Sequence, residues 1–185
     1  TATLGIYSAC YSLGNIPRMF SALINFILMI AVSKLYDEGK HDEVKVHLSF
    51  ALKYFLMLSI PFVFGSLFMS ESIIKLLTTK QIAEGSSQIT FIVSLAHLIL
   101  GILTVFSYVL LVTKKTKILA YTWTISLPLN LILNYIFIPY VGAMGAAYTT
   151  LLAYLIATIY VVYYSNKEFK FSIDWNFISK SIFSS

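Results

Sequence analysis

Charged residues are scarce in this sequence. They make up 11% of its 185 residues, whereas hydrophobic residues make up 58%; a typical soluble domain has about 25% and about 45–50%. This balance excludes a water-soluble globular domain. We therefore predict an all-α protein, a polytopic bundle of about five transmembrane helices.

Motifs of enzymes and metalloproteins are also missing. The sequence has no Gly-rich nucleotide-binding loop, no Cys or His pair at metal-ligand spacing and no candidate catalytic triad. We therefore predict neither an enzyme nor a bound metal or cofactor. The single cysteine, Cys10, cannot form an intrachain disulfide and is expected to pack in an apolar segment. The net charge of +5 does not require a nucleic acid partner, because basic loops are typical of cytoplasmic membrane flanks.

Five apolar runs reach the roughly 20 residues needed to cross a hydrocarbon core of about 30 Å. The first run is long and holds Pro17 beside Arg18, so we expect it to tilt or bend near its middle. The tail, residues 166–185, fits an amphipathic helix at the inner interface or the approach to a further span. The five runs cover residues 4–32, 50–69, 89–112, 118–138 and 144–164, and form the predicted bundle over residues 1–165.

Two connections between these runs carry helix signals. Asp42 is a candidate N-cap for a helix that continues into the second span. In the connection over residues 70–87 we expect a short interfacial helix. Its apolar residues Ile73, Ile74, Leu76 and Leu77 would dip toward the membrane.

Lysine residues gather on one side of the predicted membrane. Ten lie on that side, and only Lys75 and Lys80 lie on the other. By the positive-inside rule, the N-terminal end lies outside and the C-terminal end in the cytoplasm of a cell membrane. Because the sequence starts at Thr1 without an initiator Met, we expect a longer chain with at least one span upstream. The ten are Lys34, Lys40, Lys45, Lys53, Lys114, Lys115, Lys117, Lys167, Lys170 and Lys180.

Polar residues recur at helical spacing within the spans, where no water is available to satisfy them. The second span has no such stripe and is the best candidate to face lipid. In the fourth and fifth spans we favour packing between helices, with interhelical hydrogen bonds. The stripes are Ser8, Tyr11, Asn15, Arg18, Ala22 and Asn25 in the first span, Thr90, Ser94, His97, Gly101, Thr104 and Tyr108 in the third, Ser126, Asn130 and Asn134 in the fourth, and Thr150, Tyr154 and Thr158 in the fifth.

Arg18 stands apart from these neutral residues. It lies about 14 residues, or roughly 20 Å, from either end of its run, which is too deep for easy snorkelling. A charge at that depth costs from about 3 to more than 10 kcal/mol, so Arg18 should face a hydrated cavity or a buried anion. Its fork of donors matches phosphate oxygens. The alternative is a structural ion pair with a residue outside this sequence.

The predicted substrate-binding face therefore holds Arg18, Asn15, Tyr11 and Asn25, with His97 of the third span as a further candidate. For His97 the alternative, and the more common case, is a satisfied interior histidine. All eight acidic residues lie in connections, at span ends or in the tail. Cation-coupled drug antiporters usually need carboxylates inside the membrane, so this distribution favours an anionic cargo.

Several short motifs resemble a known family. The strongest runs from Asn130 to Tyr154, where an apolar run reaches Ile-Pro and turns, and a second run opens with Gly-Ala-Ala. Its structural residues are Asn130, Asn134, Pro139, Gly142 and Gly145. Further likenesses are Gly5-Ile6-Tyr7-Ser8-Ala9, Ala31-Val32-Ser33-Lys34-Leu35 before an acidic loop, and Lys114-Lys115-Thr116-Lys117. Together they resemble the polysaccharide-biosynthesis membrane proteins, lipid-linked oligosaccharide flippases of the multidrug, oligosaccharidyl-lipid and polysaccharide exporter superfamily.

The resemblance implies two six-helix halves around a cavity that alternates access, with this chain in the second half. It implies a polyprenyl-pyrophosphate-linked oligosaccharide as cargo. The implied partners are this cargo, membrane lipids, the N-terminal half of the same chain and, as a further candidate, the polysaccharide polymerisation machinery. Peptidoglycan-precursor flippases and cation-coupled multidrug exporters of the same superfamily remain alternatives. A non-transporting membrane scaffold subunit is an alternative of another class.

Overall fold

The structure is a computed structural model that describes residues 2–77 and 86–169, with side chains for residues 8–76 and 87–169. Every described element is an α-helix, which confirms the predicted all-α bundle. The helices are α1 (Ala2–Gly14), α2 (Ile16–Asp37), α3 (His41–Leu77), α5 (Ser86–Val112), α6 (Thr116–Val141) and α7 (Ala143–Glu168). Five spans in the described residues are long and apolar enough to cross a membrane, with α1 and α2 sharing the first. The tail helix expected over residues 166–185 lies outside the described residues beyond the end of α7.

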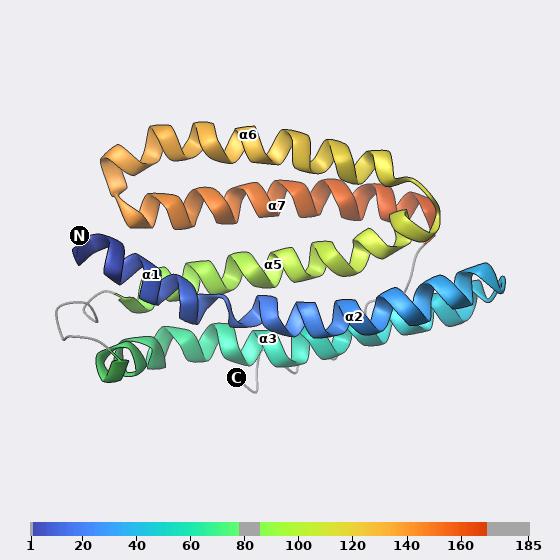
Figure 1. The fold of residues 1–185 in the computed structure, drawn as a ribbon, viewed down its shortest axis with the longest axis horizontal. Helices are drawn as coiled ribbons and strands as arrows, with labels where there is room; N and C mark the ends of the chain where they lie inside the picture. Colours follow the sequence, from blue (N-terminus) through green and yellow to red (C-terminus); the bar gives the residue numbers. More distant parts are fainter. Residues whose placement is uncertain (1, 78–85, 170–185) are drawn as a thin grey trace.

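The helices lie side by side in one elongated bundle (Figure 1). The α6–α7 hairpin forms one side, α1, α2 and α3 form the other, and α5 runs between them. In the most apolar stretch of α5, 61% of the residues are buried, compared with 11% in the span of α1 and α2 and 6% in α6. The central helix, α5, carries one of the two six-residue stripes, and its buried polar groups need partners that lipid cannot supply.

The prediction that the second span faces lipid is wrong. In α3, 39% of the most apolar stretch is buried, and Ser59, Ser66 and Ser70 lie inside the bundle. A buried serine hydroxyl can donate a hydrogen bond to a backbone carbonyl of its own helix, as Ser66 does to Val63 at 2.7 Å. A buried face therefore needs no stripe of large polar residues. The most exposed span is α6.

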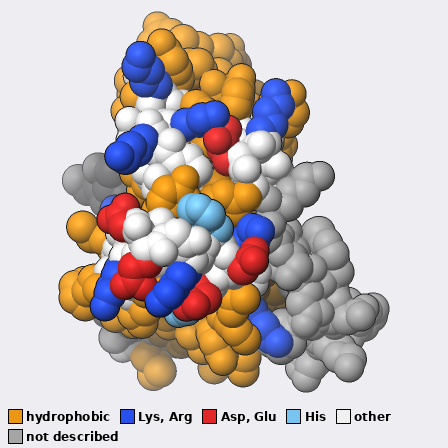
Figure 2. Space-filling model, turned by 90° about the vertical axis from the view of Figure 1, so that its right-hand side faces the viewer, with side chains coloured by type: hydrophobic (Ala, Val, Ile, Leu, Met, Phe, Trp, Pro, Cys, Tyr) orange, Lys and Arg blue, Asp and Glu red, His pale blue; other side chains and the backbone are white. Residues whose placement is uncertain are grey.

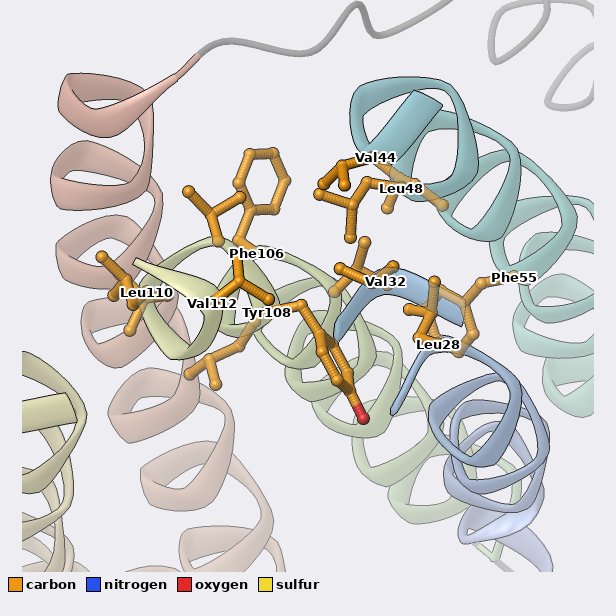
Figure 3. Close-up of a cluster of buried hydrophobic side chains, with 14 of the residues drawn as sticks. Leu28, Val32, Val44, Leu48, Phe55, Phe106, Tyr108, Leu110 and Val112 are labelled. Carbon is orange, nitrogen blue, oxygen red and sulfur yellow. The ribbon is translucent and has the colours of Figure 1, made fainter. Parts of the chain in front are cut away.

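A cluster of apolar side chains joins α2, α3 and α5 near one end of the bundle (Figure 3). Leu28 and Val32 of α2 meet Leu48 and Phe55 of α3 there. The Phe55 ring lies over Gly101 of α5, where an added Cβ would come within 2.0 Å of it. In lipid, such contacts act through close van der Waals packing rather than exclusion of water.

The expected interfacial helix over residues 70–87 is also wrong in its described part. α3 continues without a break to Leu77, and Ile74 is buried in a second apolar cluster. Cys10 lies in that cluster and is fully buried, so its predicted packing is confirmed. The connecting residues 78–85 lie outside the described part of the chain. α3 continues because its helical apolar pattern does, and Ile74 is buried in a cluster whose other members lie on α1, α5 and α7.

After the turn that follows α2, helix α3 begins slightly earlier than predicted. α3 begins at His41, so Asp42 lies in the first turn and is not the N-cap. Its carboxylate accepts a hydrogen bond from Lys45 at 2.8 Å instead. The Val44 amide donates to the carbonyl of Lys40 at 3.1 Å, and Gly39 turns the chain with a φ of 74°. The glycine therefore starts the helix earlier than the acidic residue suggested.

Charged residues gather at the end of the bundle where α2, α5 and α7 finish (Figure 2). Lys115, in the turn between α5 and α6, pairs with Glu168 at the end of α7 at 2.5 Å. Across the α2–α3 turn, Lys40 hydrogen-bonds Glu38 and so lowers the pKa of that carboxyl. Within residues 2–77 and 86–169 the predicted gathering of lysines at this end is present, whereas Lys80, Lys170 and Lys180 lie outside these ranges. Which side of a membrane this end faces stays a prediction.

Asn130, Asn134 and Thr149 tie α6 to α7. The Asn134 amide donates to the side-chain oxygen of Asn130 at 3.0 Å, and the Thr149 hydroxyl donates to that of Asn134 at 2.5 Å. Thr149 is buried, so the bonds replace contacts that water cannot make. This agrees with the packing role expected for the stripes of the fourth and fifth spans.

The turn of the hairpin lies at Gly142 as predicted, but the helix before it runs on past its predicted end at residue 138. α6 passes through Pro139 and ends at Val141, so Pro139 does not stop the helix. A proline in the last turn costs one backbone hydrogen bond, which the chain here tolerates. Gly142 makes the turn with a φ of 61° and a ψ of −140°. Gly145 lets the two helices approach, because an added Cβ would lie 3.0 Å from the carbonyl oxygen of Phe137.

Candidate functional site

The first span is interrupted where α1 ends at Gly14 and α2 begins at Ile16. Pro17 has no N–H to donate, and the Arg18 amide bonds the carbonyl of Asn15 at 3.0 Å rather than that of Gly14. The interruption therefore leaves the Gly14 carbonyl without its usual helical donor. This confirms the expected bend and places it two residues before Pro17.

His97 of α5 supplies the missing donor. Its Nδ1 lies 3.2 Å from the carbonyl oxygen of Gly14 and 3.0 Å from that of Val93. Both partners are acceptors, so Nδ1 carries the proton. α1 approaches closely here, because a Cβ on Gly14 would lie 2.8 Å from the Val93 side chain. The imidazole thus joins the break in the first span to the central helix.

The other ring nitrogen of His97 has no partner. The side chain is 1% exposed, and Nε2 makes no hydrogen bond to any described residue. Two other atoms nearby are also buried without hydrogen-bond partners among the described residues: Oδ1 of Asn15, between α1 and α2, and Oγ of Ser94 on α5. The seam between α1, α2 and α5 therefore carries more polar groups than it satisfies, which is unusual in a dry interior.

Two aromatic rings enclose His97. The ring of Tyr11 on α1 meets it edge-on, with centroids 5.6 Å apart, and the ring of Tyr154 on α7 lies 6.4 Å away. Tyr154 was not among the predicted binding residues, although it belongs to the stripe of the fifth span. Sequence spacing alone could not show that this stripe reaches the break in the first span.

Arg18 is exposed on the surface of the bundle, unlike His97. It forms no ion pair with any described residue, and its charge is close enough to act electrostatically on His97 and Tyr154. Its neighbours Met19 and Leu23 are 63% and 69% exposed. The structure thus places a cation on a largely apolar face of α2, beside the polar seam.

The predicted binding face is only partly brought together. Tyr11 contacts His97, and Asn15 lies at the break beside Arg18. Asn25 lies farther along α2, where its backbone carbonyl accepts a hydrogen bond from the Tyr108 hydroxyl at 2.9 Å. Its place in the stripe thus serves contact with α5, and Asn25 is removed from the Arg18 group by about two helical turns.

A hollow also lies between α1 and α3, but no charged residue lines it. It encloses about 320 Å³ and is lined by Leu13, Pro61, Phe62, Gly65, Ser66, Met69, Ser70 and Ile73. Its two hydroxyls donate to carbonyls of their own helix. None of these lining residues is charged, whereas the group of Tyr11, Asn15, Arg18, His97 and Tyr154 includes a cation, so it is the better candidate for an anion. We call these five residues the break site.

Comparisons with known proteins point to membrane flippases. The family model described as MatE matches residues 1–136. A relative from Haloferax volcanii, named "Probable low-salt glycan biosynthesis flippase Agl15", is 24% identical over 184 residues, 97% of this chain and 39% of the relative. A solved structure, "Lipid II flippase MurJ, inward closed conformation", shares the fold with a TM-score of 0.74 at 24% identity, over 97% of this chain and 39% of that chain. The chain thus spans about two fifths of the length of each.

Proposed function

The chain belongs to the MatE family, and on this premise we propose that it forms part of a flippase for a lipid-linked oligosaccharide. The cargo would be joined to its lipid through an anionic pyrophosphate and moved outward across the cytoplasmic membrane. The names of the two relatives support this proposal, since one is a glycan biosynthesis flippase and the other a lipid II flippase.

The observation that carries the proposal is Arg18. A charge on a membrane-spanning helix is costly wherever it meets lipid, by about 3 kcal/mol or more. Arg18 is exposed and forms no ion pair with a described residue. Its face of α2 is therefore best explained as the wall of a hydrated cavity in the complete transporter, where an anionic group supplies the missing counter-charge.

The break site suits a pyrophosphate. The planar guanidinium can donate two parallel hydrogen bonds to phosphate oxygens. Asn15 lies three residues before Arg18, and Tyr11 contacts His97. The lipid tail would stay in the bilayer while the headgroup passes Arg18. The interruption at Asn15 gives the first span a place to bend as the cavity changes the side to which it opens.

A flippase for another lipid-linked glycan, such as a peptidoglycan precursor, is the second candidate, favoured by the fold shared with the lipid II flippase structure. A cation-coupled drug exporter is less well supported, because the acidic residues in the described helices lie near helix ends. We also place the charged end of the bundle in the cytoplasm. A cysteine at Lys115 should then resist an impermeant thiol reagent added outside intact cells, and labelling would reverse the orientation.

Substitution of Arg18 in the native full-length protein tests the proposal. In a glycan-export complementation assay, Arg18→Ala should lose most of the transport and Arg18→Lys should keep part, because lysine retains the charge without the planar fork. Met19→Ala, on the same exposed face, is the matched control and should transport normally. Normal transport by Arg18→Ala would refute the anion site. Loss of folded protein in that variant would instead identify Arg18 as half of a structural ion pair.

A further inference from the structure

His97 is the buried titratable group that the proposed transport step leaves unused. Its Nδ1–H is committed to two backbone carbonyls, whereas Nε2 has a lone pair and no donor among the described residues. A neutral imidazole can therefore accept a proton at Nε2 without giving up the bonds that hold the break in the first span. The ring would keep its position in both protonation states.

The charges around His97 oppose that proton while the site is empty. Tyr11 of α1 and Tyr154 of α7 place aromatic rings against His97, and Arg18 of α2 brings a positive charge near it. On the nearby half of α3, Glu71 and Lys75 are exposed, and on α1 the buried Cys10 belongs to an apolar cluster. No described carboxylate is thus positioned to stabilise an imidazolium.

An anion bound at Arg18 reverses this balance. Two negative charges beside the guanidinium would offset its field and attract a second positive charge nearby. The protonated Nε2 would become a donor on a seam that has surplus acceptors, since Oδ1 of Asn15 also lacks a donor among the described residues. Because His97 itself is buried, water screens its charge less than it screens that of the exposed Arg18.

We infer that the break site binds its anionic ligand together with one proton, which His97 takes from solvent onto Nε2 and returns to solvent when the ligand leaves. Arg18 supplies the permanent charge and His97 the conditional one. Each ligand then raises the affinity for the other by the same factor, as linkage requires. This inference rests on the proposed function, since it assumes an anion at Arg18.

Calorimetry on the purified full-length protein tests the linkage. The probe is geranyl-pyrophosphoryl-glucose, whose pyrophosphate is esterified at both ends and does not titrate near neutral pH. Titrations in buffers of different ionisation enthalpy count the protons taken up on binding. Wild type should take up a fraction approaching one proton, and its affinity should fall about fivefold or more as the pH rises through the histidine range, about pH 5 to 8.

Two variants locate the proton. His97→Gln can still donate to the Gly14 carbonyl but cannot titrate, so it should bind the probe with no proton uptake and a flat pH profile. His47→Gln changes an exposed histidine of α3 and should behave like wild type. Binding by wild type without proton uptake would overturn the inference while leaving the proposed function intact. Proton uptake that persists in His97→Gln would overturn it as well.

A spectroscopic measurement covers the case in which His97→Gln does not fold. With ¹⁵N-labelled histidine in the wild-type protein, probe binding should move the Nε2 signal of His97 from the unprotonated to the protonated range. An unchanged signal in the presence of bound probe would refute the inference. Failure of wild type to bind the probe would refute the proposed function instead, so the two outcomes are distinguishable.

Discussion

Two helix interfaces, or seams, in this bundle carry polar side chains, which are hydrogen-bonded in one seam and partly lack partners among the described residues in the other. Between α6 and α7, Asn130, Asn134 and Thr149 form a chain of hydrogen bonds. Between α1, α2 and α5, atoms of Asn15 and His97 are buried without partners among the described residues. Both seams began as stripes of similar residues at similar spacing. The comparison shows that a polar stripe marks a face that lies inside the bundle. Whether its side chains find hydrogen-bond partners then separates a packing interface from a candidate site.

The largest expected change in stability is at the turn that closes the satisfied seam. Gly145→Leu should destabilise the full-length protein by about 1–3 kcal/mol or more, because its side chain must enter the space beside the Phe137 carbonyl. Gly65→Leu is the control, since nothing lies within 4 Å of a Cβ built at Gly65. Thermal unfolding in detergent measures both. Equal stability of the two variants would show that α6 and α7 do not need this close approach.

The turn itself rests on a different requirement from Gly145. No atom lies within 4 Å of a Cβ built at Gly142, and its φ of 61° is the constraint.

A coupling of about 1 kcal/mol is expected within the satisfied seam. A double-mutant cycle with Asn134→Ala and Thr149→Val should show non-additive losses of stability, because each change alone already removes the hydrogen bond that joins the two residues. Thr150→Val serves as the matched control: its hydroxyl bonds only the Ala146 carbonyl of its own helix, so it should add independently to Asn134→Ala. Additive losses for both pairs would remove the distinction between the two seams.

In the seam between α1, α2 and α5, removing a polar group should not lower stability as we expect it to do between α6 and α7. Ser94 is fully buried, and its hydroxyl has no partner among the described residues. Ser94→Ala should therefore leave stability unchanged or raise it by up to about 1 kcal/mol, because a desolvated hydroxyl is removed. Denaturation under the conditions used for Thr149→Val gives the direct comparison. A loss as large as that of Thr149→Val would mean that Ser94 is satisfied in the complete protein.

The smallest effect is expected at the charged end. Lys40 lowers the pKa of Glu38, so the pair contributes above the ordinary carboxyl pKa of an unfolded glutamate and loses its contribution as the pH falls through the lowered value. Both side chains are exposed, and water screens them. Glu38→Gln should not measurably change the melting temperature at neutral or acidic pH. Glu168→Gln, which removes a less exposed carboxylate, should have the larger effect at neutral pH.

The sequence predicted much of the helical framework. Long apolar runs and one-sided lysines anticipated five spans and a charged end, and the motif around Gly142 and Gly145 anticipated the hairpin. The errors have local causes. α6 runs through Pro139, α3 begins before Asp42, and Ile74 continues α3 because distant helices bury it.

The candidate site was predicted less completely. The charge of Arg18 within an apolar run singled it out as a candidate from the sequence, and the fold brings His97 from another span near it. Their roles in binding stay predictions. Tyr154 and the role of Gly14 were not predicted, and Asn25 proved to lie apart. Each of these depends on how one helix is rotated relative to another. The spacing of residues within one helix shows which of them share a face, but not which helix that face contacts.

By itself, then, the sequence determined where the chain is helical, how long each span is and which face of each span is polar. These properties follow from local chemistry and from a helical repeat of about 3.6 residues. Tertiary structure alone decided which polar groups find partners. The bond from His97 to Gly14 and that from Tyr108 to Asn25 each join residues 83 positions apart. Bonds of that kind exist only once the helices have packed, because a span alone in hydrocarbon has no such neighbour.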